Sequence, residues 1–118
     1  MEKESIIAED PRGIPVACDE SALDWILRLK HPELKNRIKR THVIATISSP
    51  NHGIIYVSNH KADRYIYYKN FKEFEPEVMI VVAFSDPKIG VITSIHFVSV
   101  RAPGERIVWP PKLAQVPN

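Results

Sequence analysis

Residues 78–100, VMIVVAFSDPKIGVITSIHFVSV, decide the fold of this chain. They contain two runs rich in β-branched and aromatic residues, Val78–Phe84 and Val91–Val100, and such runs predict strands. The turn between them, Asp86–Gly90, contains a proline and a glycine and is short enough to make the two strands an antiparallel pair. Because both runs are almost continuously apolar, we expect them at the centre of a sheet.

Two further strands are predicted upstream, at Ile54–Ser58 and Arg64–Lys69. The second has mixed polarity, which favours a position near the rim of the sheet. Alternation along it sends Arg64 to one face and Tyr67 and Lys69 to the other. The sequence therefore predicts an antiparallel sheet of about four strands in the second half of the chain.

The first half has a different pattern. Ser5–Glu9 and Ile14–Cys18 flank a Pro-Arg-Gly turn and predict a hairpin. Apolar residues at three- and four-residue spacing then predict a helix that stops near Lys30, and a second helix that starts at His31-Pro32-Glu33 and ends before Ser48. The predicted fold class is α+β, with an N-terminal hairpin and two helices packed on the curved sheet.

Length and composition indicate one domain over residues 1–118, with an extended, peripheral tail from about residue 103 that contains four prolines. No apolar run approaches the roughly 18–20 residues that cross a bilayer. The charged N-terminus lacks the apolar core of a signal peptide, and a single cysteine excludes a disulfide scaffold. We therefore expect a cytoplasmic protein without a membrane segment.

Charge is distributed unevenly along the chain, although the net charge is only +2. Residues 28–40 carry six basic residues and one acidic residue, a density that attracts a polyanion such as RNA. A solvated helix face is the alternative interpretation. The candidate RNA-binding residues in this stretch are Lys35, Arg37, Lys39 and Arg40.

Strong local motifs for nucleotide hydrolysis, acyl transfer and structural zinc are missing from the sequence. Its five histidines lack the spacing that places two metal ligands on one helical face, so no metal or cofactor is expected. His31 is the most informative histidine, because a helix start offers N–H groups to a phosphate. Capping of the helix is the alternative for His31, and a hydrogen-bonded structural role is the simplest interpretation of His96.

The predicted strand at 64–69 also carries side chains suited to phosphate chemistry. Arg64 can clamp a phosphate, Lys69 can offset developing charge, and the tyrosines can stack on bases or donate protons. The alternative is an amphipathic edge strand whose tyrosines cover the core. On the last predicted strand, alternation groups Thr93 with Ile95, and Ser94 with Ile92 and His96.

Several short motifs occur in a familiar order: His31-Pro32-Glu33-Leu34, Arg64 with Tyr67-Tyr68-Lys69, and Gly90-Val91-Ile92-Thr93. This order resembles the phage-associated branch of the barnase, EndoU, colicin and RelE-like (BECR-fold) nuclease superfamily, over about residues 6–110. The resemblance implies a RelE/barnase-like domain with a metal-independent RNA-cleaving site. The catalytic residues that it implies are His31, Arg64, Lys69 and Thr93, and the chemistry of the strand at 64–69 adds Tyr67 to the candidates.

The leading hypothesis is thus a small endoribonuclease, toxin-like, that cleaves RNA by general acid/base chemistry at a ribose 2′-hydroxyl. The family also suggests an antitoxin or another protein partner. Members of this family often carry a histidine in the first helix, where this chain has Asp24-Trp25-Ile26, and an aromatic residue where it has Ile95. A catalytically degenerate RNA- or protein-binding module of the same fold is therefore the second hypothesis, and a small-molecule pocket protein is a third.

Overall fold

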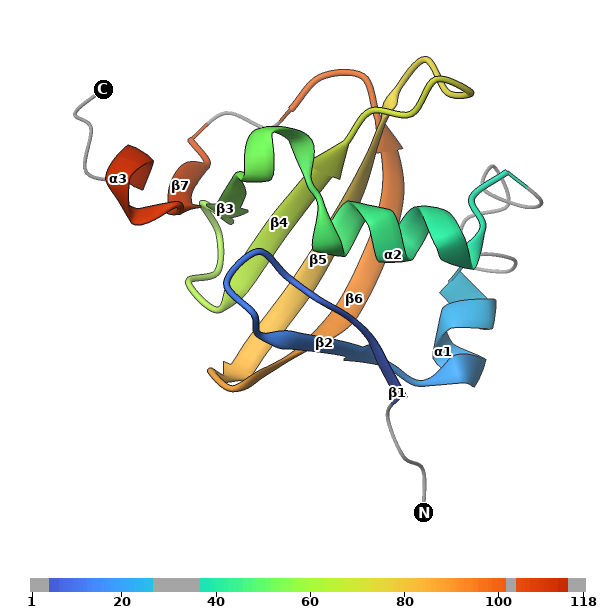
Figure 1. Cartoon of the computed structure of the whole chain (residues 1–118), viewed down its shortest axis with the longest axis horizontal. Helices are drawn as coiled ribbons and strands as arrows, with labels where there is room; N and C mark the ends of the chain where they lie inside the picture. The colour runs from blue at the N-terminus through green and yellow to red at the C-terminus, as the bar shows by residue number, and fades with distance from the viewer. Residues whose placement is uncertain (1–4, 27–36, 102–103, 115–118) are drawn as a thin grey trace.

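The computed structural model of the chain describes residues 5–26, 37–101 and 104–114 (Figure 1). Seven strands form one sheet: β1 (Ser5–Glu9), β2 (Pro15–Cys18), β3 (Ile55–Val57), β4 (Arg64–Lys69), β5 (Glu77–Asp86), β6 (Ile89–Val98) and β7 (Arg106–Trp109). The described helices are short: α1 (Glu20–Trp25), α2 (Arg40–Ser48), the 3-10 turn η3 (Asn51–Gly53) and α3 (Pro111–Ala114).

The strand order across the sheet is β1-β2-β6-β5-β4-β3-β7. Every neighbouring pair is antiparallel except β2 and β6, which are parallel. The predicted arrangement of two helices on a four-stranded antiparallel sheet is therefore wrong: the protein is mostly sheet, and the sheet is mixed. The N-terminal hairpin belongs to the same sheet, because β2 extends it at the β6 side.

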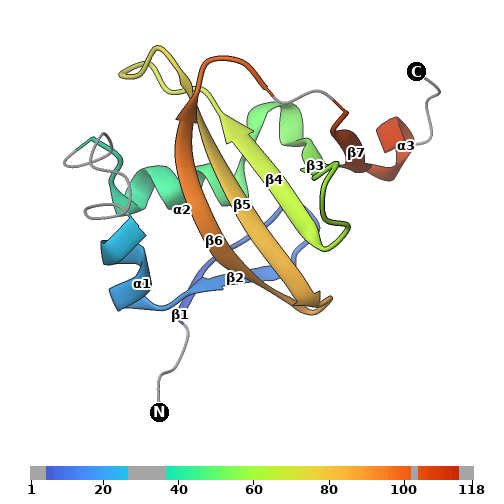
Figure 2. The ribbon, with the colours of Figure 1, turned by 180° about the vertical axis from the view of Figure 1, so that it is seen from behind.

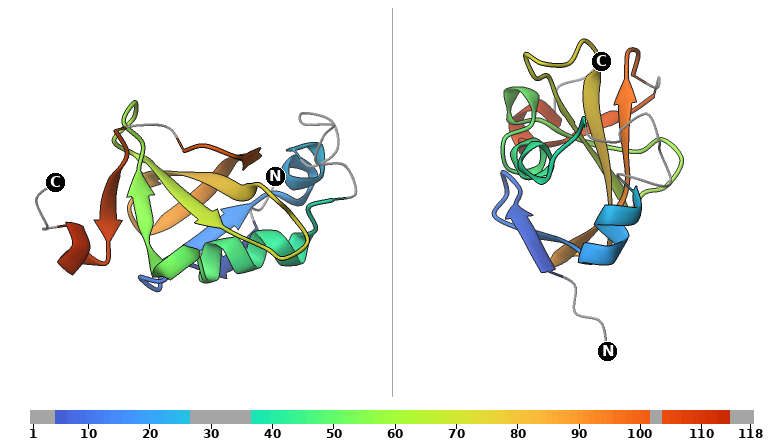
Figure 3. Two further views of the ribbon diagram at one scale, coloured as in Figure 1. Left: turned by 90° about the horizontal axis from the view of Figure 1, so that it is seen from above. Right: turned by 90° about the vertical axis from the view of Figure 1, so that its right-hand side faces the viewer.

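Burial alternates along the two central strands. In β5, Val78, Ile80 and Val82 are fully buried, whereas Met79 and Val81 between them are partly exposed. Such alternation is typical of an antiparallel sheet with one packed face. The two strands are the third and fourth of the seven across the sheet, so the predicted central position is confirmed. The helix α2 covers only one of their faces (Figures 2 and 3).

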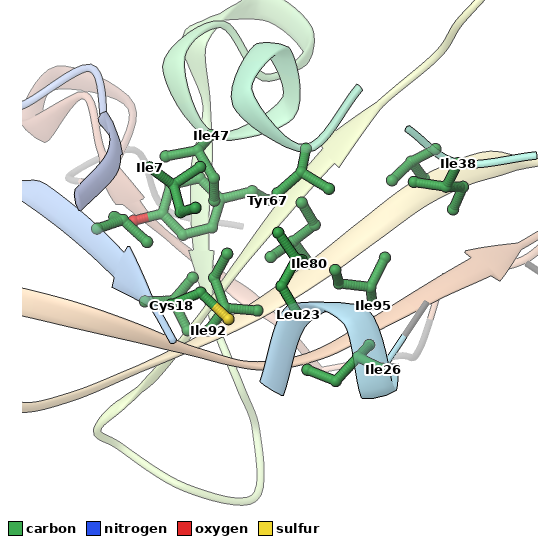
Figure 4. Close-up of a cluster of buried hydrophobic side chains, with 14 of the residues drawn as sticks. Ile7, Cys18, Leu23, Ile26, Ile38, Ile47, Tyr67, Ile80, Ile92 and Ile95 are labelled. Atoms are coloured by element: carbon green, nitrogen blue, oxygen red, sulfur yellow. The ribbon is translucent and has the colours of Figure 1, made fainter. Parts of the chain in front are cut away.

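The main core lies between this covered face, α1 and α2 (Figure 4). It is built mostly from β-branched and leucine side chains, with Ile47 from α2 and Ile80 and Ile95 from the sheet completely buried. Full burial of one such side chain stabilises a fold by roughly 1.5–3 kcal/mol. The opposite face of β5 and β6, which we call the open face, carries no helix among the described elements.

The C-terminal segment forms a strand and a short helix, whereas its prolines predict only an extended tail. β7 pairs with β3 at the edge of the sheet, and α3 follows it. The tail predicted to be extended from about residue 103 thus supplies the seventh strand. Among the described helices, none is long and apolar enough to cross a membrane.

Candidate functional site

The structure does not bring Arg64 and Lys69 together. They occupy the first and last positions of β4, so about 17 Å of extended chain separates them. They also lie on opposite faces, as alternation predicts: Lys69 shares the face of Tyr67, which packs in the core, and Arg64 shares the open face. One phosphate cannot contact both side chains in this arrangement.

Three of the predicted catalytic side chains are engaged by the protein itself. The Lys69 ammonium donates a 2.6 Å hydrogen bond to the carbonyl of Ser49, just after α2. The Thr93 hydroxyl donates to the carbonyl of Val81 at 3.1 Å. Arg64 forms an ion pair with Asp63, with 3.0 Å between Nη1 and Oδ2.

Tyr67 lies in the core (Figure 4). Its hydroxyl donates to the carboxylate of Asp10 at 2.7 Å, and the same carboxylate accepts from the guanidinium of Arg12 and from the backbone N–H of Ile14. Burial raises the pKa of Tyr67 far above its ordinary value, and the negative Asp10 raises it further. These contacts give Tyr67 a structural role at the β1–β2 turn.

The basic stretch is only partly described. Arg37, Lys39 and Arg40 are exposed, and the Arg37 guanidinium packs 4.6 Å from the ring centre of Phe97 on the covered side of the sheet. His31 and Lys35 lie outside the described residues. The three described basic residues therefore lie beside α2 rather than on the open face.

The open face brings together a carboxylate and an imidazole that the sequence did not connect. In the β5–β6 ladder, Glu77 is opposite Val98 and Met79 is opposite His96. Glu77 and His96 are thus diagonal neighbours on one face, about 7–8 Å apart at their Cα atoms. Both side chains are partly exposed.

Arg101, which follows β6, holds the Glu77 carboxylate in a two-pronged ion pair. Its Nε donates to Oε1 at 2.9 Å and its Nη2 to Oε2 at 2.7 Å, and Asn51 adds a third donor at 2.7 Å. The hydrogen bonds to Glu77 raise the pKa of Arg101, so it stays charged at any pH of interest. The side chains of Arg101 and Glu77 remain 34% and 19% exposed.

Tyrosines support this group from β3 and β4. The Arg101 guanidinium stacks 4.1 Å from the ring centre of Tyr68 and donates to the Tyr56 hydroxyl at 3.0 Å. The Tyr68 hydroxyl donates to both oxygens of Glu105, and burial raises its pKa above the ordinary value. Arg101 is therefore fixed against the sheet with its charge directed at Glu77.

The expected strand begins at Val78, which leaves Glu77 outside the sheet, so the sequence did not predict this cluster. A β-bulge in β6 is a second feature that the sequence did not predict. Ser94 pairs with Val81 and Ile92 pairs with Val82, so one extra residue, Thr93, interrupts the alternation. Ile92 and Ile95 both enter the core as a result, whereas strict alternation assigns them to opposite faces. No local signal in the sequence marks the bulge.

Within the described ranges, no group of three or more His, Cys, Asp or Glu side chains is arranged to hold a metal ion. Comparisons with protein-family models, with curated proteins and with solved structures found no match. The chemistry of the open face is thus the basis for assigning a function.

Proposed function

We propose that this chain is a cytoplasmic, metal-independent endoribonuclease whose reacting groups are Glu77, His96 and Arg101 on the open face. The observation that carries the proposal is the register of β5 and β6, which makes a carboxylate and an imidazole diagonal neighbours beside a fixed arginine. An acid and a base on either side of one phosphate are what cleavage of RNA at a 2′-hydroxyl requires.

In the proposed reaction, the Glu77 carboxylate takes the proton of a ribose 2′-hydroxyl. The 2′-oxygen attacks the adjacent phosphorus, and the bond between phosphorus and the 5′-oxygen breaks. Protonated His96 gives its proton to that leaving oxygen, so the products are a 2′,3′-cyclic phosphate and a 5′-hydroxyl. Arg101 offsets the negative charge that develops on the pentacoordinate phosphorus.

A further cation on the same face supports an RNA substrate. Met79 and Val81, which are partly exposed, separate it from the cleavage group along the face. Arg64 lies on the same face, about 13 Å along β4 from Tyr68. It is therefore suited to a neighbouring phosphate of the same strand rather than to the one that is cleaved.

The test is cleavage of a labelled RNA of mixed sequence in EDTA, comparing wild type with Glu77→Gln and His96→Gln. We expect wild type to give 2′,3′-cyclic phosphate ends and each variant to lose at least roughly 100-fold in rate, the usual effect of removing a general acid or base. Lys88→Gln, on the exposed β5–β6 turn, is the matched control and should cleave like wild type. Absence of cleavage by wild type, or full activity of both variants, would contradict the proposal.

The contacts of Glu77 favour a second function, an RNA-binding module that does not cleave. Its carboxylate already accepts three hydrogen bonds from Arg101 and Asn51, which leaves one lone-pair direction for a substrate hydroxyl. Under this alternative, wild type binds the same RNA without cutting it. Glu77→Gln then changes affinity only, because it loosens Arg101.

A further inference from the structure

His52, in the η3 turn, has an unusual backbone conformation beside the proposed cleavage group. In the described ranges it is the only residue other than glycine with a positive φ, 59°. It occupies the third position of a turn that the N–H of Gly53 closes on the carbonyl of Pro50 at 2.8 Å. A positive φ at this position favours glycine or asparagine. Residues held in such conformations cluster at functional sites, so the side chain of His52 is of interest.

The imidazole of His52 is free to bind a ligand. The residue is exposed, and within the part of the chain that the structure describes no hydrogen bond, ion pair or ring contact engages its side chain. His42, by contrast, uses both ring nitrogens in contacts within the protein. An imidazole donates hydrogen bonds and gains positive charge near neutral pH, so a phosphate oxygen suits it as a partner.

The position of His52 follows from its neighbour Asn51. The Asn51 Nδ2 donates to the Glu77 carboxylate at 2.7 Å, and its Oδ1 accepts a 3.0 Å hydrogen bond from the backbone N–H of Asn70, which directly follows β4. Asn51 is thus fixed on the β4 side of Glu77. Consecutive Cα atoms are about 3.8 Å apart, so the imidazole of His52 is within one side-chain length of this contact.

His96 lies on the other side of Glu77. The strand β5, which carries Glu77, is between β6 and β4 in the sheet, and His96 belongs to β6. The two imidazoles therefore flank the Glu77 carboxylate from opposite sides. An RNA strand that crosses this end of the sheet from β6 towards η3 passes His96 first, then Glu77 and then His52.

We infer that His52 is a further substrate-contacting residue of this site, and that its imidazole binds the phosphate next to the cleaved one on the η3 side of Glu77. The inference rests on the proposed function for the identity of the substrate. His96 and Arg101 act on the cleaved phosphate, whereas His52 and Arg64 hold the strand on either side of it. Because this contact exists before and during the reaction, it strengthens substrate binding and leaves the chemical step unchanged.

The first test is cleavage of a labelled RNA in EDTA by His52→Gly and His52→Asp, whose new residues both tolerate a positive φ. His52→Gly should raise KM roughly three- to tenfold, the range that corresponds to one hydrogen bond, and should leave kcat within about twofold. The negative charge of His52→Asp should raise KM further. The matched control is His60→Asp, at an exposed histidine of the β3–β4 loop at the opposite end of β4, and its KM should be that of wild type.

A second measurement does not need cleavage. Its probe is a pentamer of deoxyuridine, which lacks the 2′-hydroxyl and is not cut. Fluorescence anisotropy gives its Kd, which His52→Gly should raise by the same factor as KM. In an NMR titration of wild type, the pentamer should move the imidazole Cε1–H signal of His52 and leave that of His60 in place. Urea denaturation of His52→Gly should give nearly the midpoint of wild type.

The outcomes separate this inference from the proposed nuclease. Cleavage by wild type with an unchanged KM and Kd in His52→Gly would overturn the inference and leave the nuclease standing, and so would a fall in kcat alone. Binding of the pentamer by a wild type that does not cut RNA contradicts the nuclease, and a raised Kd in His52→Gly then still supports the phosphate contact. If His52→Gly is less stable than wild type, the Cε1–H signal decides: a saturable shift supports the contact, and no shift overturns it. A wild type that neither cuts nor binds would contradict both.

Discussion

At the scale of single residues, the hydroxyl of Tyr67 connects β4 to the β1–β2 turn. Its pKa is raised in the folded state, so folding favours the neutral phenol. The stabilisation is complete below the ordinary pKa of about 10 and is lost as the pH rises above it. We expect the free energy of unfolding in urea to fall between pH 8 and pH 11, and to fall less in Tyr67→Phe than in wild type.

Tyr67→Phe should also cost about 1–3 kcal/mol at pH 8, because the buried Asp10 loses one of its donors. In this variant Asp10 keeps its hydrogen bonds from the Arg12 guanidinium and from the backbone N–H groups, so the loss in stability reports the Tyr67 hydroxyl alone. Identical pH profiles for the two proteins would show that the Tyr67 hydroxyl does not contribute in this way.

Gly90 is a second position where a single added atom, a Cβ, is expected to lower stability. It pairs with Val16 in the parallel β2–β6 ladder, and a Cβ there would lie 2.5 Å from Val82 Cγ1 and 2.6 Å from Phe84 Cζ. Overpacking of this kind costs roughly 1–3 kcal/mol. We therefore expect Gly90→Ala to lower the midpoint of thermal unfolding, measured by circular dichroism, whereas an unchanged midpoint would mean that Phe84 moves aside freely.

Residue positions within β4 could be predicted from the sequence, and those within β6 only in part. Alternation is a local property, so Arg64 and Tyr67 lie on opposite faces as expected. His96 shares a face with Ser94, also as alternation predicts, whereas the bulge at Thr93 moves Ile92 to the core face. The bulge and the diagonal position of His96 relative to Glu77 depend on pairing with β5, which nearby residues do not reveal.

At the scale of elements, His42 fixes the start of α2. Its Nδ1 accepts a 2.9 Å hydrogen bond from the backbone N–H of Lys39, so in the neutral ring the hydrogen is on Nε2, which is 3.0 Å from Glu73. The ring also packs edge-on against Phe71 and Phe74. One histidine thus joins the helix start to the β4–β5 connection.

His42→Ala should therefore cost roughly 1–2 kcal/mol in free energy of unfolding, the range found for loss of a helix cap. Urea denaturation followed by circular dichroism measures this. Glu73→Gln is the matched control, because glutamine keeps an acceptor for Nε2 and the side chain is exposed; its stability should be nearly that of wild type. Equal losses of stability in both variants would mean that the stabilisation comes from the ion pair between His42 and Glu73 and not from the helix cap.

Elements with local signals could be predicted, and those that depend on distant partners could not. The hairpin of β1 and β2, the β5–β6 pair and the end of α2 follow turn residues and periodicity. The parallel pairing of β2 with β6 joins segments about 70 residues apart, and nothing in Val16 or Ala17 marks it. β7 could not be predicted because the prolines on either side of it, at positions 103, 110 and 111, indicate an extended tail rather than a paired strand.

At the scale of the whole molecule, the charged residues considered for RNA binding lie on two opposite sides of the sheet. The open face carries Arg64, Glu77 and His96, whereas the exposed Lys39 and Arg40 accompany α2 on the covered side. A single strand of RNA bound across the open face does not need the basic residues beside α2. The salt dependence of RNA binding therefore distinguishes binding on the open face from binding beside α2.

For single-stranded nucleic acid, each neutralised phosphate contributes about 0.7 to the slope of log K against log salt. We expect Arg64→Gln to reduce the magnitude of that slope by about 0.7, because it removes one phosphate contact from the open face. The double variant Lys39→Gln with Arg40→Gln should leave the slope as in wild type. Fluorescence anisotropy of a labelled RNA in EDTA, from low to physiological salt, gives all three slopes. A loss of slope in the double variant with none in Arg64→Gln would move the RNA to the side of α2, and would make a basic binding module the better description of this protein.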